Sequence, residues 1–255
     1  MIRRPPRSTL DRSSAASDVY KRQVDHLSEA FAARLGELNT GEINIAAGES
    51  TLLYLLPEYV KKFAKAYPGV RIKLHNVTGR AGLAMLRADE ADFAVGSMIE
   101  VPNDISYLPI HEFETVLIAP KGHPLAKRSA KKLTLADISP YSLILPPRQL
   151  YTWRMVEMVF NQHKLPYNVT LEAGGWEVIK KYVELGLGIS VVTDICLTGR
   201  EKIVRISLPA YFPTRSYGIV MRQKTYLSPP AQTFIDMVAS GFSTTKHIRR
   251  SGRKG

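Results

Sequence analysis

The chain of 255 residues contains a single cysteine, Cys196, so it can form no internal disulfide bond. A lone cysteine of this kind is more often a small buried residue than a nucleophile, and we assign Cys196 no role. The sequence has no apolar run near the roughly 18 residues that a membrane helix needs, and its N-terminus lacks the apolar core of a signal peptide. These absences predict a cytoplasmic protein that does not enter a membrane.

Motifs for catalysis and metal binding are also absent. The six histidines show neither a His-Glu-x-x-His spacing nor a cluster with cysteine, so no metal site is predicted. There is no Gly-x-Ser-x-Gly turn, no phosphate-binding loop and no pair of carboxylates whose spacing supports acid–base chemistry. Glycines at 186 and 188 end a helix and begin a strand, the reverse of the order in dinucleotide sites. We therefore expect no catalytic residue and no cofactor.

The net charge of +12 is concentrated at the two ends of the chain. Residues 1–23 contain six Lys or Arg and two Asp, and residues 241–255 contain five Lys or Arg and no acidic residue. The body between them is nearly balanced, so its charge does not indicate nucleic-acid binding. Residues 1–23 resemble a translated sequencing adapter, and a native disordered basic arm is the alternative. We predict a disordered or artefactual leader over 1–23 and a disordered basic tail over 241–255.

Apolar periodicity predicts an alternation of strands and helices. Residues 24–38 show the three- and four-residue spacing of one helix face. Strands are then predicted at 42–47, 70–75 and 92–96, separated by helices that end near residues 67 and 89. This order of strands and helices predicts a parallel sheet with right-handed crossovers.

The same rhythm returns after residue 115 and predicts a second unit. Its strands are expected at 115–119, 142–145, 168–172, 189–193 and 202–206, and strand 216–222 and a helix at about 229–240 follow. Because the second unit lies between two parts of the first, we predict an α/β fold with two Rossmann-like lobes and a cleft between them. Lobe I is expected over about 42–118 and 217–240, and lobe II over about 119–216.

Polar residues follow the first two predicted strands at positions suited to anion binding. Ser50 and Thr51 stand at the start of a helix, where free backbone N–H groups and the helix dipole favour an anion. Thr78, Gly79 and Arg80 occupy the equivalent place after the second strand, and Arg80 can supply a guanidinium fork. A helix N-cap at Ser50 and a solvated Arg80 are the alternatives.

Four further residues lie next to predicted strands or helices. Ser97 and Arg148 each follow a strand, and Thr193 ends one. Trp176 begins a helix and either closes over a ligand or packs between the lobes. Since loops at the carboxyl ends of parallel strands face the ligand in open α/β folds, we predict one site for a small, anionic metabolite.

The order of these segments resembles the effector domain of LysR-type transcription regulators over about residues 42–240, with 24–40 similar to the end of their linker helix. The phrases that carry the resemblance are GEINIAAGES, LLPEY, FAKAYPGV, ADFAVGS, APKGHPLAK, VIKKYVELGLGISVV and LSPPA. VIKKYVELGLG and ADFAV look closest to the cysteine-biosynthesis regulator branch, whose members sense small sulfur metabolites or sulfate. The stretch around Arg148 departs from that branch.

This resemblance implies the architecture of type 2 periplasmic binding proteins, with a small-molecule effector between the lobes. It implies a homodimer or homotetramer, built through the helix at 51–67 and the helix near Phe234, and DNA contact only through an N-terminal head that is missing from this chain. Two other functions share the fold class. They are a free-standing solute-binding protein of a transport system and a two-lobed transferase, which the missing signal peptide and catalytic motifs respectively disfavour.

Overall fold

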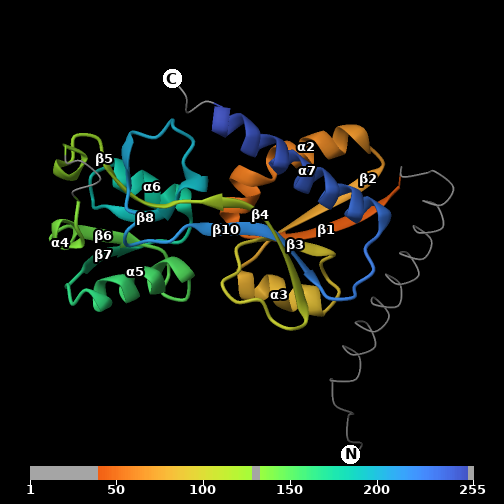
Figure 1. Ribbon diagram of the computed structural model, residues 1–255, viewed down its shortest axis with the longest axis horizontal. Coiled ribbons are helices and arrows are strands. Elements are labelled where there is room, and N and C mark those ends of the chain that lie inside the picture. Colours follow the sequence, from red (N-terminus) through yellow and green to blue (C-terminus); the bar gives the residue numbers. More distant parts are fainter. Residues whose placement is uncertain (1–39, 128–132, 252–255) are drawn as a thin grey trace, which may run out of the picture.

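The computed structural model describes residues 40–127 and 133–251. Two lobes lie side by side along its long axis (Figure 1). One contains a five-stranded sheet with the order β2-β1-β3-β10-β4, and the other contains the sheet β8-β5-β9 and the pair β6-β7. We call the first lobe I and the second lobe II. The predicted two-lobed α/β fold is confirmed, whereas the predictions for residues 1–23 and 24–39 lie outside the described residues.

Lobe I begins with three parallel strands, as the sequence predicts. They are β1 (Gly41–Ala47), β2 (Val70–Asn76) and β3 (Phe93–Gly96), with η1 (Thr51–Leu55), α2 (Pro57–Ala66) and α3 (Gly79–Arg87) between them. The helix predicted to end at residue 67 is divided, because η1 is a turn of π-helix and Pro57 starts a new helix. The carboxyl ends of β1, β2 and β3 point toward lobe II (Figure 1).

Two antiparallel strands complete the sheet of lobe I. β4 (Ile105–Phe113) was not predicted, and β10 (Arg215–Arg222) lies between β3 and β4. The ladder between β10 and β4 shifts register at Gly218, where a Cβ atom would lie 2.1 Å from the Leu108 carbonyl oxygen. Only glycine therefore allows this close approach of two backbones.

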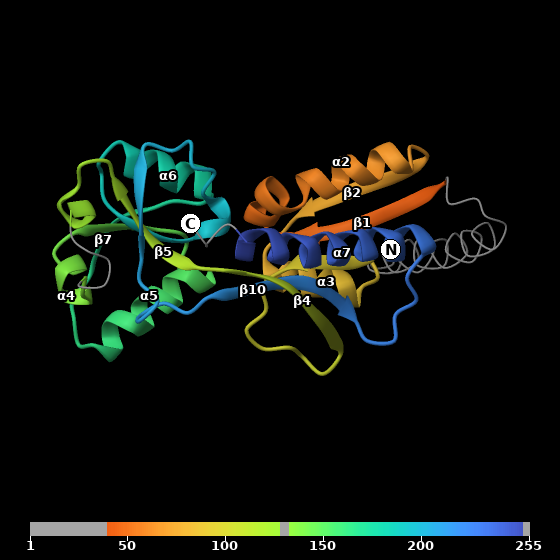
Figure 2. The same cartoon turned by 45° about the horizontal axis from the view of Figure 1, so that its top comes forward.

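The last helix, α7 (Pro229–Ser251), covers the sheet of lobe I (Figure 2). Its backbone runs beyond the predicted end at residue 240, so residues 241–251 are helical where a disordered tail was predicted. Phe234 is fully buried, with its ring 5.2 Å from that of Phe63 and 5.8 Å from that of Phe93. Phe234 itself is thus a core residue, and the dimer contact expected through the helix around it stays a prediction.

Lobe II contains two small sheets joined edge to edge. Its elements are β5 (Thr115–Pro120), η2 (Pro124–Lys127), α4 (Leu135–Ile138), β6 (Ser142–Leu145), α5 (Tyr151–Gln162), β7 (Asn168–Glu172), α6 (Trp176–Glu184), β8 (Ser190–Thr193), η4 (Asp194–Cys196) and β9 (Ile203–Ser207). The Ser190 hydroxyl donates to the Ile144 carbonyl at 2.6 Å and joins β8 to β6. Residues 115–118, assigned to lobe I from the sequence, lie in the sheet of lobe II. The chain crosses between lobes after β4 and before β10.

Candidate functional site

The loop after β1 begins the helical segment that faces lobe II. The Gly48 carbonyl accepts the N–H groups of Thr51 at 3.0 Å and Leu52 at 3.1 Å. Ser50 and Thr51 retain only 9% and 1% of their exposed area. Within the described residues, neither hydroxyl has a hydrogen-bond partner. The two residues are largely buried and their hydroxyls make no hydrogen bond with the described residues, so both hydroxyls are suited to a ligand.

The loop after β2 lies beside the loop after β1. Val77 donates its N–H to Ala47 at 3.0 Å, and its carbonyl lies 3.8 Å from the position that a Cβ of Gly48 would take. The Thr78 hydroxyl accepts the Ala81 N–H at 3.4 Å and caps α3. Thr78, Gly79 and Arg80 are exposed, so this predicted part of the site is open and partly occupied by helix capping.

The predicted residues of lobe II occupy different environments. Thr193 is 4% exposed, pairs with Thr115 across β8 and β5, and directly precedes η4. Trp176 packs partly buried on the apolar cluster of lobe II that contains Ile179. Arg148 is exposed, with its guanidinium carbon 4.9 Å from the ring centre of Trp153.

The lobes make contact at the loop after β1. The Glu49 carboxylate lies against Gly175, where a Cβ atom would be 3.3 Å from one carboxylate oxygen. Gly175 has φ +87°, a conformation that favours glycine. η1 also packs against η4. This contact brings the loop of Ser50 and Thr51 next to those of Trp176 and Thr193, whereas no described hydrogen bond or ion pair connects them to Arg148.

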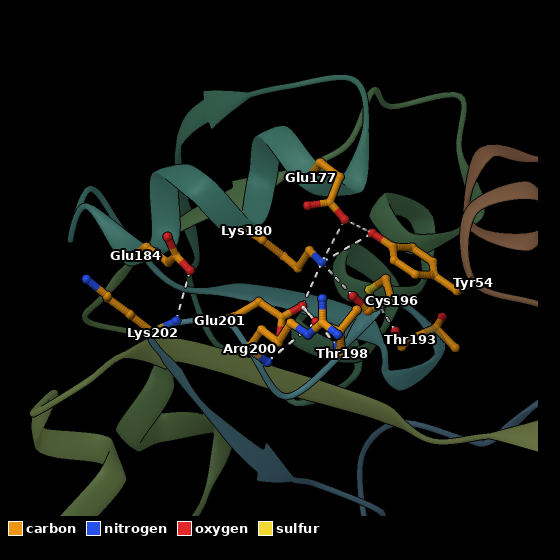
Figure 3. Close-up of polar contacts among 10 residues, drawn as sticks. All are labelled: Tyr54, Glu177, Lys180, Glu184, Thr193, Cys196, Thr198, Arg200, Glu201 and Lys202. Atoms are coloured by element: carbon orange, nitrogen blue, oxygen red, sulfur yellow. Dashed lines mark hydrogen bonds and ion pairs between the residues drawn. The ribbon is translucent and has the colours of Figure 1, made fainter.

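A buried lysine network crosses between the lobes and was not predicted. Lys180 of α6 has a side chain that is 3% exposed. Its Nζ donates to the Cys196 carbonyl at 2.7 Å, to the Glu201 carboxylate at 2.8 Å and to the Tyr54 hydroxyl at 3.2 Å, and it forms an ion pair with Glu177 at 2.9 Å (Figure 3). The Tyr54 hydroxyl itself donates to Glu177. Tyr54 belongs to η1, so this network connects lobe I to lobe II.

Hydrogen bonds and ion pairs within the network favour the ionised forms of Lys180 and Glu201. Burial raises the pKa of Glu201, but hydrogen bonds from Lys180 and Thr198 outweigh it and lower that pKa to about 2. Burial lowers the pKa of Lys180, while the hydrogen bonds that its ammonium donates to Glu201 and Glu177 more than offset this and raise that pKa. Burial raises the pKa of the Cys196 thiol to about 12. Cys196 is therefore the inert buried residue that the sequence suggested.

One signal in the sequence could have revealed this network. Trp176, Ile179 and Val183 follow the helical spacing of a buried face, and Lys180 falls on the same face. A lysine at such a position must find partners of opposite charge. Among the described residues, no group of histidine, cysteine or carboxylate side chains could hold a metal ion. None of the described helices is long and apolar enough to span a membrane.

The chain belongs to the family described as the LysR substrate binding domain, whose model matches residues 36–243. Proteins of this family have the two-lobed fold of type 2 periplasmic binding proteins. The chain is thus the effector-binding domain of a LysR-type transcription regulator, and the transport function is not favoured. These results confirm the resemblance seen in the sequence.

The relatives agree with the predicted branch. The chain is 28% identical over 202 residues to the HTH-type transcriptional regulator CysB of Burkholderia cenocepacia, covering 78% of this chain and 64% of that protein. The cofactor-binding domain of the Cbl transcriptional regulator matches with a TM-score of 0.71 and 25% identity, over 85% of this chain and 95% of that one. The effector-binding domain of QuiR in complex with shikimate matches with a TM-score of 0.70 and 20% identity, over 80% of this chain and 98% of that one. The chain therefore spans less than two thirds of the length of the CysB relative.

Proposed function

We propose that this domain binds a small anionic metabolite where the loop after β1 meets lobe II. The single observation that carries the proposal is the pair of largely buried residues Ser50 and Thr51 at the start of a helical segment, whose hydroxyls make no hydrogen bond with the described residues. Thr193 adds a buried threonine from lobe II. Hydroxyl and backbone N–H donors can hold an oxyanion without burial of another full charge.

The other predicted residues complete the proposed site. Thr78, Gly79, Arg80 and Ser97 extend it along the edge of lobe I, and Trp176 and Arg148 extend it on lobe II. Shikimate in QuiR supports an acidic effector for this fold. The similarity to CysB and Cbl supports a small sulfur metabolite or sulfate as the first ligands to test.

The effector acts through geometry rather than chemistry in this proposal. A ligand that contacts both lobes stabilises one relative position of the lobes, and a homodimer or homotetramer transmits that change. DNA contact belongs to a separate head that precedes the linker helix in a whole regulator, and we place the protein in the cytoplasm. We propose no enzymatic activity, since the Lys180 ammonium is already paired with the carboxylates of Glu177 and Glu201.

Replacement of Thr51 by valine tests the site. The Thr51→Val variant keeps the shape of the side chain but removes the hydroxyl, so affinity should fall by about 0.5–3 kcal/mol, with the larger value for a charged ligand. Calorimetry with sulfate, O-acetylserine and shikimate measures this change. Thr233→Val on α7 is the matched control, because its hydroxyl donates within its own helix to Pro229. Equal affinity of wild type and Thr51→Val for a ligand that binds would remove Thr51 from the site.

A further inference from the structure

Arg215 is an arginine whose charge no carboxylate neutralises within the described residues. Arg71, Arg87, Arg205 and Arg222 each form an ion pair with an aspartate or glutamate. Arg215 is partly buried and has no such pair in the described part of the chain, and its buried Nε has no hydrogen-bond partner there. A buried donor without a partner costs free energy, so this position calls for an explanation.

Aromatic rings hold the Arg215 guanidinium in place. Its central carbon lies 4.8 Å from the ring centre of Tyr151 and 5.6 Å from that of Tyr217. Stacking on ring faces stabilises the cation but uses none of the N–H donors, which lie in the plane of the guanidinium. The donors along its edge therefore remain suited to a carboxylate or sulfate lying in the same plane.

Arg215 stands where the two lobes join. It is the first residue of β10 and pairs with Phe113 at the end of β4, while Tyr151 is the first residue of α5 in lobe II. Gly218 of β10 pairs with Gly96 at the end of β3, and the two strands are antiparallel. The start of β10 therefore lies beside the loop after β3.

Two hydrogen bonds fix this neighbourhood. The Tyr107 hydroxyl donates to the Ser216 carbonyl at 2.9 Å. The Thr115 hydroxyl donates to the Pro213 carbonyl at 2.8 Å, and Thr115 pairs with Thr193. Arg215 thus lies near the loop after β3, which contains Ser97, and near the strand that ends at Thr193.

We propose that Arg215 binds the acidic group of the effector, an oxyanion of the carboxylate or sulfate type, as the charged anchor of the site. This inference rests on the proposed function. The sequence pointed to Arg80 and Arg148 as cationic residues, but both are exposed. Arg215 combines partial burial, a fixed orientation and an unmet donor, and it contacts a residue of lobe II. An oxyanion bound by Arg215 would therefore lie between the start of β10 and α5 of lobe II.

Substitution of Arg215 tests the inference with sulfate and shikimate as probes. In calorimetry, Arg215→Gln should weaken binding of the probe that the wild type binds by about 10- to 100-fold, because a hydrogen-bonded charge is lost. Arg215→Lys keeps the charge but loses the fork, so it should weaken binding less than Arg215→Gln does. Arg222→Gln is the control on the same strand, because Arg222 already pairs with Asp89 at 2.6 Å, and its affinity should stay within about twofold of the wild type.

The outcomes separate this inference from the proposed function. If Arg215→Gln and Arg215→Lys bind the probe as tightly as the wild type while Thr51→Val binds it weakly, the inference is wrong and the proposed site stands. If neither sulfate nor shikimate binds the wild type, this inference is overturned, and the proposed function is overturned with it if O-acetylserine also fails to bind. Tighter binding of sulfate identifies an inorganic or sulfur oxyanion as the effector group, and tighter binding of shikimate identifies a carboxylate. The urea-unfolding transition of each variant verifies that the variants are folded.

Discussion

Replacement of Lys180 by methionine should destabilise the domain far more than its size change suggests. The side chain is 3% exposed, and its removal leaves the Glu201 carboxylate, 11% exposed, without its cation. Breaking a buried ion pair from one side costs roughly 3–5 kcal/mol. Glu177 is 57% exposed and can turn to water, so its loss of a partner adds at most about 1 kcal/mol. We expect Lys180→Met to lower the free energy of unfolding by about 3–5 kcal/mol.

A second substitution shows whether the stranded charge is the cause. The double variant Lys180→Met with Glu201→Gln removes both charges, and the amide oxygen can still accept the Thr198 N–H. At least half of the lost stability should return. Lys181→Met is the control, because Lys181 is 66% exposed and lies 3.4 Å from Glu184, and it should change stability by less than about 0.5 kcal/mol. Urea unfolding measures all three, and a double variant no more stable than Lys180→Met refutes the reasoning.

Three further predictions concern other parts of the fold. The pKa of Glu201 is about 2 in the folded domain and 4.5 is its ordinary value, so its contribution to the free energy of unfolding is complete above pH 4.5 and is lost as the pH falls toward 2. Glu201→Gln should therefore flatten the pH dependence of urea unfolding between these two values, and an unchanged pH profile would contradict the prediction. Gly218→Ala should lower the free energy of unfolding by at least about 1–3 kcal/mol, because the new Cβ would meet the Leu108 carbonyl. A variant that unfolds thermally at the same temperature as the wild type would argue against this contact. Cys196, with a thiol pKa of about 12, should react with a thiol reagent only after urea unfolding; rapid labelling of the folded domain would exclude the buried position.

Most strands and helices follow from the spacing of apolar residues. The strands at Ser142–Leu145 and Asn168–Glu172 have the predicted bounds, because each has a short apolar pattern between clear turns. β4 escaped prediction because Pro109 and exposed residues interrupt its pattern. β4 lies at the edge of its sheet, where proline is tolerated since one side of the strand needs no partner.

The sequence predicted the candidate site less completely than it predicted the fold. Ser50 and Thr51 could be chosen because they follow the carboxyl end of a parallel strand. Thr193 could be chosen because it ends a buried strand, although β8 pairs antiparallel with β5. The helical spacing of α6 marks Lys180 as buried, but it does not reveal the partner in lobe I, and no local pattern reveals the role of Arg215. Tyr54 lies 126 positions from Lys180, and no local pattern predicts such a pairing.

The position of β10 has a consequence for the order in which the protein is made. β3 and β4 are complete once residue 113 has been synthesised, but the strand that lies between them starts at residue 215. Every strand of lobe II is synthesised in that interval, so lobe II can complete its sheets while the inner edges of β3 and β4 are still unpaired. Such open edges are sites of wrong association during synthesis. A released chain that ends shortly before residue 215 should therefore contain a protected lobe II attached to an aggregation-prone half of lobe I.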